Sequence, residues 1–165
     1  MGASQTPDAG WGVGPVADRL AALGIDRPAV AAPVGSYVPA VRDGDLVLTS
    51  GQLPFVDGTL PATGKVGADV APEQAQELAR RAAVNAVAAV HELIGDLEQV
   101  AQVVKVVGFV ASAPDFTAQP AVVNGASDVL AEIFGDAGRH ARSAVGVAVL
   151  PLDSPVEVEI TVRVR

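Results

Sequence analysis

The sequence predicts an α+β fold in which two helices pack on one face of a single sheet. Two segments, one from Pro72 onward and one over residues 121–134, repeat apolar residues at helical spacing. Several shorter segments are continuously apolar or alternate strictly, which is typical of strands. Their order is β-β-α-β-α-β-β. Two helices cover only one face of a sheet of about five or six strands, so the other face stays open.

The chain begins with an arm and a short helix. Residues 1–14 read as a flexible arm, in a start that is rich in Gly, Pro and Ala. Val16, Leu20 and Leu23 then recur at helical spacing. We therefore divide the chain into an N-terminal arm with a short helix, residues 1–30, and one main domain, residues 31–165.

A hairpin and a long loop come next. The apolar runs 37–41 and 46–50 flank the pair Asp43-Gly44, which is a hairpin signal. Pro and Gly then recur through residues 53–69, which predicts a long surface loop. Loops of this kind often border a site.

The remaining elements alternate between helix and strand. Pro72 begins the clearest helix, whose stripe of mostly small residues suits close packing on a sheet. Residues 103–111 are nearly all β-branched or apolar, which predicts a strand covered on both faces. The helix over 121–134 follows, and strands at 141–150 and 155–165 end the chain.

The sheet face without helices needs a cover. In the strand 141–150 the second set of side chains, Arg142, Ala144, Gly146 and Ala148, is small rather than solvated. An apolar sheet face that no helix covers usually meets another subunit. We therefore expect an oligomer.

Composition excludes several classes of function. Half of the residues are apolar and 18% are charged, as in compact globular proteins. The absence of Cys excludes disulfides and thiolate metal sites, and it fits a reducing cytosol. A net charge of -8 argues against a nucleic-acid partner. No signal peptide or membrane segment is evident, so we expect a soluble, cytoplasmic protein without a membrane partner.

Motifs for metal or nucleophilic chemistry are missing. Glycines before Lys65 resemble a phosphate-binding loop, but Val66 stands where Ser or Thr would bind magnesium. His91 and His140 are the only imidazoles, and a catalytic zinc takes three protein ligands, so we read both as surface or capping residues. No Gly-x-Ser-x-Gly elbow is present.

Arg142 and Glu157 are the strongest candidates for chemistry. Residue types alone favour an ion pair on a strand face, because charged residues on strands mostly face water. A guanidinium in a partly apolar cleft is, alternatively, a bidentate clamp for a substrate carboxylate. A nearby carboxylate then orients or deprotonates a water molecule.

Five short segments carry a resemblance to a known family. They are Gly-Ser-Tyr at 35–37, Thr-Ser-Gly-Gln-Leu-Pro at 49–54, Ala-Arg-Ser at 141–143, and Leu-Pro at 150–151 with Val-Glu-Val-Glu at 156–159. From about residue 33 to the C-terminus the chain resembles the RidA family, also called YjgF. The resemblance implies a chorismate-mutase-like mixed sheet, a homotrimer with clefts between subunits, and no cofactor. It also implies hydrolysis of carboxylate-bearing enamines and imines, such as 2-aminoacrylate, to 2-keto acids and ammonia.

The resemblance also implies roles for single residues. Arg142 matches the carboxylate-binding arginine, Glu157 the water-associated glutamate and Tyr37 the site tyrosine. Ser50 and Gly51 match the loop that lines the substrate. Since an imine carbon is already electrophilic, a carboxylate clamp and a held water supply mainly proximity and orientation. Tyr37 reads equally well as a half-buried aromatic with a satisfied hydroxyl.

Departures from the family pattern point to a divergent subgroup. Ser36 replaces the usual Pro, and Ala144 stands where many members carry Cys. Many family members carry a site Asn on this helix. In this sequence that position is Ser127, and the nearest Asn, Asn124, lies one turn earlier, so we expect one of these two residues to line the cleft. A non-catalytic trimer that binds small carboxylates or shields hydrophobic clients therefore stays as an alternative. An RNA-directed role, described for some relatives, is disfavoured by the acidic charge and by few aromatic residues.

The geometry of the last two strands bears on how the site is built. If they pair as a hairpin with Val149 opposite Val156, Glu157 lies about 20 Å from Arg142. One chain then does not bring Arg142 and Glu157 together, and we expect them to meet across an interface between subunits.

Overall fold

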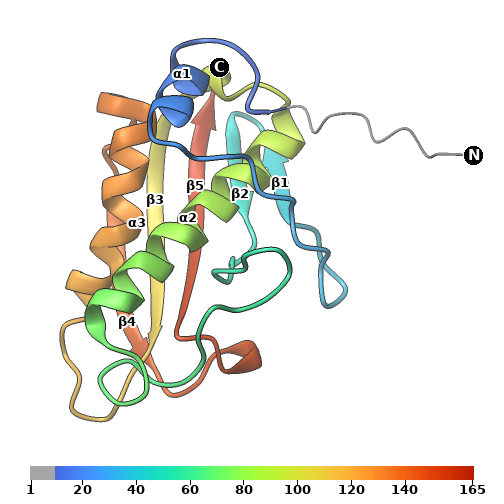
Figure 1. Cartoon of the computed structure of the whole chain (residues 1–165). Helices are drawn as coiled ribbons and strands as arrows, with labels where there is room; N and C mark the ends of the chain where they lie inside the picture. The colour runs from blue at the N-terminus through green and yellow to red at the C-terminus, as the bar shows by residue number, and fades with distance from the viewer. Residues whose placement is uncertain (1–9) are drawn as a thin grey trace, which may run out of the picture.

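The computed structural model describes residues 10–165, so most of the arm predicted over residues 1–14 lies outside the described residues. The described residues form three α-helices and one five-stranded sheet, arranged as in Figure 1. The helices are α1 (Pro15–Ala22), α2 (Pro72–Ile94) and α3 (Gln119–Phe134). The strands are β1 (Ala40–Asp43), β2 (Leu46–Thr49), β3 (Val100–Ala111), β4 (Ala141–Val147) and β5 (Val156–Val164). The fold is α+β, as predicted, and no helix within residues 10–165 is long and apolar enough to span a membrane.

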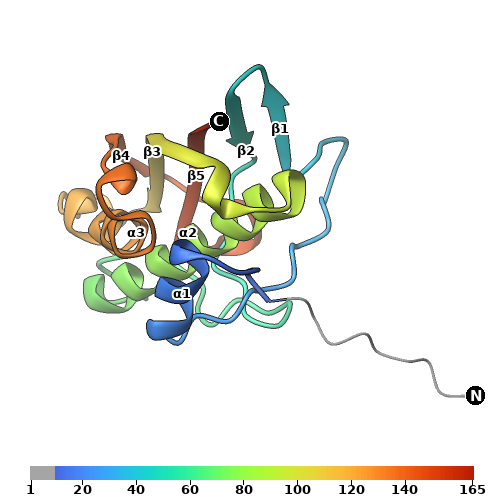
Figure 2. The ribbon, with the colours of Figure 1, turned by 90° about the horizontal axis from the view of Figure 1, so that it is seen from above.

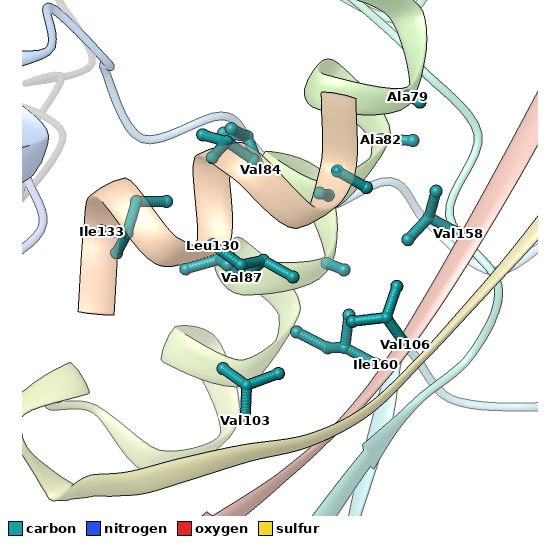
Figure 3. Close-up of a cluster of buried hydrophobic side chains, with 14 of the residues drawn as sticks. Ala79, Ala82, Val84, Val87, Val103, Val106, Leu130, Ile133, Val158 and Ile160 are labelled. Carbon is teal, nitrogen blue, oxygen red and sulfur yellow. The ribbon is translucent and has the colours of Figure 1, made fainter. Parts of the chain in front are cut away.

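The helices gather on one side of the sheet, which Figure 2 shows from above. Between α2, α3 and the sheet lies the core, where Val87, Leu130 and Ile160 point toward one another (Figure 3). Small residues make this packing close. A Cβ built on Gly125 of α3 would lie 2.9 Å from the backbone carbonyl carbon of Gln76 in α2, so the helices touch through a position that only Gly fills.

The sheet has the order β1-β2-β5-β3-β4. The predicted hairpin is confirmed, because Asp43 of β1 pairs with Leu46 of β2 and Gly44 in the turn has a φ of 62°. The predicted pairing of the last two strands is wrong. β5 lies between β2 and β3, and β4 pairs parallel to β3 at the edge of the sheet.

Burial explains why β5 takes the central place. Its five apolar residues, Val156, Val158, Ile160, Val162 and Val164, are all buried beneath the helices. The residues of β4 are only half-buried or exposed, which suits an edge strand. The connection between β4 and β5 passes through Leu152 and Asp153, both with positive φ, and it crosses to the far side of β3 instead of forming a two-residue turn.

No helix of the described chain covers the opposite face of the sheet (Figure 2). The pairing register places Leu48 of β2, Glu157 of β5 and Val145 of β4 on that face. Leu48 and Val145 are both exposed. The strand 103–111 was expected to be covered on both faces, but within one chain its second face is only half-buried.

Candidate functional site

A cleft of about 280 Å³ lies where the segment before β1, the loop after β2 and the start of β5 meet. Its lining is mostly apolar, and Glu157 is its one charged group. The lining residues are Ala31, Ala32, Pro33, Val34, Tyr37, Pro39, Gly51, Gln52, Leu53, Phe55, Pro151 and Glu157. Three of the residues expected at the site, Tyr37, Gly51 and Glu157, therefore share one cleft.

Gly51 is small because Glu157 occupies the space beside it. Gln52 extends the pairing of β2 with β5, since its N–H donates to Val158 O at 2.8 Å and its carbonyl accepts from Val158 N–H at 3.0 Å. This pairing brings the backbone of Gly51 against the Glu157 side chain. A Cβ on Gly51 would lie 2.7 Å from Glu157 Cδ and closer still to Oε1, so any larger residue displaces the carboxyl group.

Burial in the cleft raises the pKa of the Glu157 carboxyl above its ordinary value, and the neighbouring charge of Glu159 adds to this effect. A raised pKa makes the carboxylate a stronger base. Glu157 is therefore suited to take a proton from a water molecule.

Tyr37 lines the cleft, whereas Ser50 joins two of the segments that form it. Tyr37 is half-exposed, and its Oη accepts a hydrogen bond from Val34 N–H at 3.3 Å, which leaves its own hydroxyl hydrogen for another acceptor. Ser50 does not line the cleft. Its Oγ donates to Val38 O at 2.6 Å and its N–H to Pro39 O at 2.8 Å, so Ser50 ties the segment before β1 to the loop after β2.

Two residues of α2 hold the loop after β2, and neither was expected from the sequence. Asn85, which is buried, donates from Nδ2 to Leu53 O at 2.9 Å and to Phe55 O at 3.2 Å. Arg81 donates from Nε to Phe55 O at 2.8 Å. Asn85 could have been identified in the sequence, because it is an amide in an otherwise apolar stretch of helix and a buried amide needs hydrogen-bond partners.

Arg142 lies on the edge strand β4 and points toward α3. Its Nη1 donates to Asn124 Oδ1 at 2.8 Å and to Ser127 Oγ at 3.2 Å, and its Nη2 donates to Pro120 O at 3.3 Å. Both helix residues that the sequence left as alternatives therefore contact this guanidinium. Ala144 follows on the same face, where it packs against the core. The expectation that Arg142 and Ala144 lie on the sheet face without helices is therefore wrong, because both are in register with residues on the helix side.

These contacts leave one edge of the guanidinium open. They use both hydrogens of Nη1 and one of Nη2, and no other bond to Arg142 occurs within residues 10–165. No carboxylate in that range forms an ion pair with it. The Nε–H and the second Nη2–H together match the two oxygens of a carboxylate.

Arg142 and Glu157 lie on opposite faces of the sheet. Arg142 is in register with Val106, and Val106 with Ile160, both buried on the helix side. Glu157 is in register with Phe109 on the open side. The ion pair between Arg142 and Glu157 on one strand face is therefore not formed. The chain carries two half-sites, which we call the Glu157 half-site and the Arg142 half-site.

The two histidines do not form a metal centre. His91 is buried and packs edge-to-face against Trp11, with ring centroids 5.7 Å apart, so it is not a surface residue. Burial and the charge of Arg27 lower the pKa of His91. Within residues 10–165 no group of three or more His, Cys, Asp or Glu is placed to hold a metal ion.

Known proteins resemble the chain over most of its length. A family model described as "YjgF/chorismate mutase-like, putative endoribonuclease" matches residues 17–163. Protein TCP17 of Trypanosoma cruzi is 45% identical over 153 residues, 92% of this chain and 96% of that protein. The 2-iminobutanoate/2-iminopropanoate deaminase of Escherichia coli K12 is 38% identical over 133 residues, 80% of this chain and 91% of that one. The crystal structure of a "putative endoribonuclease" from Shewanella oneidensis has a TM-score of 0.88 at 35% identity, and the match covers 90% of this chain and 99% of that one.

Proposed function

The chain belongs to the RidA (YjgF) family, and on this basis we propose that it hydrolyses reactive 2-enamine and 2-imine acids to 2-keto acids and ammonia. The observation that carries the proposal is the open edge of Arg142, held by three hydrogen bonds and without a carboxylate partner in the described chain. The relatives named as imine deaminases support the same reaction class.

The reaction divides between the two half-sites. Arg142 binds the substrate carboxylate through Nε and Nη2, which fixes the position of the adjacent imine carbon. Glu157 takes a proton from a water molecule as the water oxygen bonds to that carbon. The electron pair of the C=N bond moves to nitrogen, which takes a proton from solvent, so the product of this step is a carbinolamine. Protonated Glu157 then gives its proton to the nitrogen, the C–N bond breaks to release ammonia, and loss of the hydroxyl proton to solvent completes the keto group.

A second copy of the chain is required to complete this site. Because Arg142 and Glu157 face away from each other across one sheet, their meeting needs the Glu157 half-site of one chain to face the Arg142 half-site of another. The exposed apolar residues of the open sheet face support association through that face. We propose the homotrimer that the family resemblance implies, with one site at each interface.

The test is ammonia release from imines that an amino-acid oxidase generates in situ. Arg142→Lys keeps the charge but removes the planar fork, so kcat/KM should fall roughly 30- to 5,000-fold. Arg80→Lys is the matched control, because Arg80 forms a surface ion pair with Glu132 at 2.8 Å outside both half-sites. Its kcat/KM should stay within about twofold of wild type.

Two outcomes would contradict the proposal. Unchanged kcat/KM in both Arg142→Lys and Arg142→Ala would mean that Arg142 does not bind the substrate. A wild-type protein that binds 2-keto acids but releases no ammonia would favour the non-catalytic trimer.

RNA cleavage is the activity that the names of some relatives suggest. The net charge of -8 and the apolar lining of the Glu157 half-site offer few contacts to phosphates. We therefore expect no saturable RNA binding in the micromolar range at about 0.15 M salt. Tight RNA binding that weakens with salt would favour an RNA-directed function over imine hydrolysis.

A further inference from the structure

His140 lies directly before β4, and both of its ring nitrogens have partners. Nδ1 is 2.6 Å from Gly138 O, and Nε2 is 2.8 Å from Ser127 Oγ. The same Ser127 oxygen accepts a hydrogen bond from Arg142 Nη1 at 3.2 Å. His140 is thus connected to the guanidinium through one hydroxyl group.

A backbone carbonyl only accepts, so Nδ1 of His140 donates to Gly138 O. In the tautomer with its hydrogen on Nδ1 alone, Nε2 is the acceptor, and Ser127 donates its hydroxyl hydrogen to it. Its oxygen keeps its lone pairs for Arg142, so the chain of hydrogen bonds runs in one direction from Arg142 to Gly138.

The Gly138 end of this series of hydrogen bonds is rigid. A Cβ on Gly138 would lie 2.9 Å from Ala131 Cα, because the turn containing Gly138 packs directly against the backbone of α3. Gly138 is buried. The carbonyl that fixes the ring of His140 therefore has little freedom to move.

We propose that His140 is a positioning residue for carboxylate recognition, acting through Ser127 to fix the orientation of Arg142. Without an acceptor at Nε2, the Ser127 hydroxyl turns between its staggered rotamers, and its hydrogen competes for the space that Arg142 Nη1 occupies. The open edge of the guanidinium then loses its fixed direction. This inference rests on the proposed function, since it assigns His140 to the carboxylate-binding step.

Three variants separate this role from a structural one. His140→Gln places an amide oxygen near Nε2 and keeps an acceptor for Ser127, whereas His140→Asn keeps only a donor near Nδ1 for Gly138. His140→Ala removes both contacts. The assays are imine hydrolysis, with kcat and KM determined separately, and calorimetric binding of pyruvate as a carboxylate probe.

We expect His140→Ala and His140→Asn to raise KM and the pyruvate Kd roughly 3- to 10-fold, with a smaller change in kcat, and His140→Gln to restore most of the loss. The double variant Ser127→Ala/His140→Ala should be no weaker than Ser127→Ala alone, because both act through one hydroxyl.

Other patterns would overturn the assignment. Rescue by Asn but not by Gln would show that His140 only fixes the turn at Gly138. A KM and a pyruvate Kd within twofold of wild type in His140→Ala would exclude the positioning role. If wild type binds pyruvate in the expected variant order but hydrolyses no imine, the proposed reaction fails and the role of His140 stands. If it neither binds nor hydrolyses, both fail.

Discussion

Glu157 shows how a single residue acquires its chemistry from a neighbour distant in sequence. The bare backbone of Gly51 lets the carboxyl group lie in the cleft, and burial there raises its pKa. In the sequence, Glu157 and Glu159 are equivalent positions of one alternating strand. The pairing of Gln52 with Val158 distinguishes them in the fold, because it brings the loop after β2 over Glu157.

The raised pKa of Glu157 predicts a change in stability with pH. A carboxyl whose pKa is higher in the folded state than in the unfolded state costs folding free energy once pH rises through that pKa. Glu157→Gln should therefore melt at the same temperature as wild type near pH 4 and about 1–3 °C higher at pH 8. Imine hydrolysis should fall in the same variant.

The measurement is calorimetric melting across this pH range. Glu92→Gln, on an exposed residue of α2, is the control and should show no gain at pH 8. A Glu157→Gln protein that is less stable than wild type at pH 8 would mean that the carboxylate is stabilised in the folded state.

The residues of the site could be predicted from the sequence only in part. Arg142 and Glu157 stand out as charged groups on apolar strands. Arg81 and His140 do not, and Asn85 stands out only as an amide in an apolar stretch of helix, because the partners of all three are backbone carbonyls or a hydroxyl in other elements. Such contacts leave no periodic pattern in the sequence.

At the scale of elements, local patterns predicted each helix and strand but not every pairing. The starts of α2 at Pro72 and of β2 at Leu46 follow from a proline at N1 and from an Asp-Gly turn. In the fold β5 packs against α2, while β3 and β4 pack against α3. Which strands each helix covers is a property of the whole core, so adjacency in sequence suggested the wrong partner for β4.

The segment before β1 forms one wall of the Glu157 half-site, which predicts a preference among substrates. Val34, 84% exposed in one chain, lines the cleft together with Pro33 and Tyr37. In the proposed reaction this wall would contact the substrate side chain, and Val34→Ser removes apolar contact area from it. It should lower kcat/KM roughly 3- to 5-fold for the imine derived from leucine and leave that for the alanine imine unchanged.

Val13→Ser is the matched control, because Val13 is 89% exposed and does not line this cleft. It should leave both rates unchanged. Equal losses for both imines in Val34→Ser would contradict a contact specific to the side chain.

At the scale of the molecule, the open sheet face predicts assembly. Light scattering at low micromolar concentration should give about three times the chain mass of 16.6 kDa. Leu48→Asp, at a 40% exposed position of that face, should shift the protein toward monomers. Leu93→Asp, at a 44% exposed position on α2, should not. A wild-type monomer would exclude a site between subunits.

The opposite orientation of the two half-sites has a genetic consequence. If each site joins halves of two chains, Arg142→Ala and Glu157→Gln impair different halves, and the two variants should complement each other. Co-expression at equal levels with random assembly would leave about one interface in four with both halves intact, and activity near a quarter of wild type. A site contained in one chain would recover nothing, because every copy in the mixture would carry a lesion.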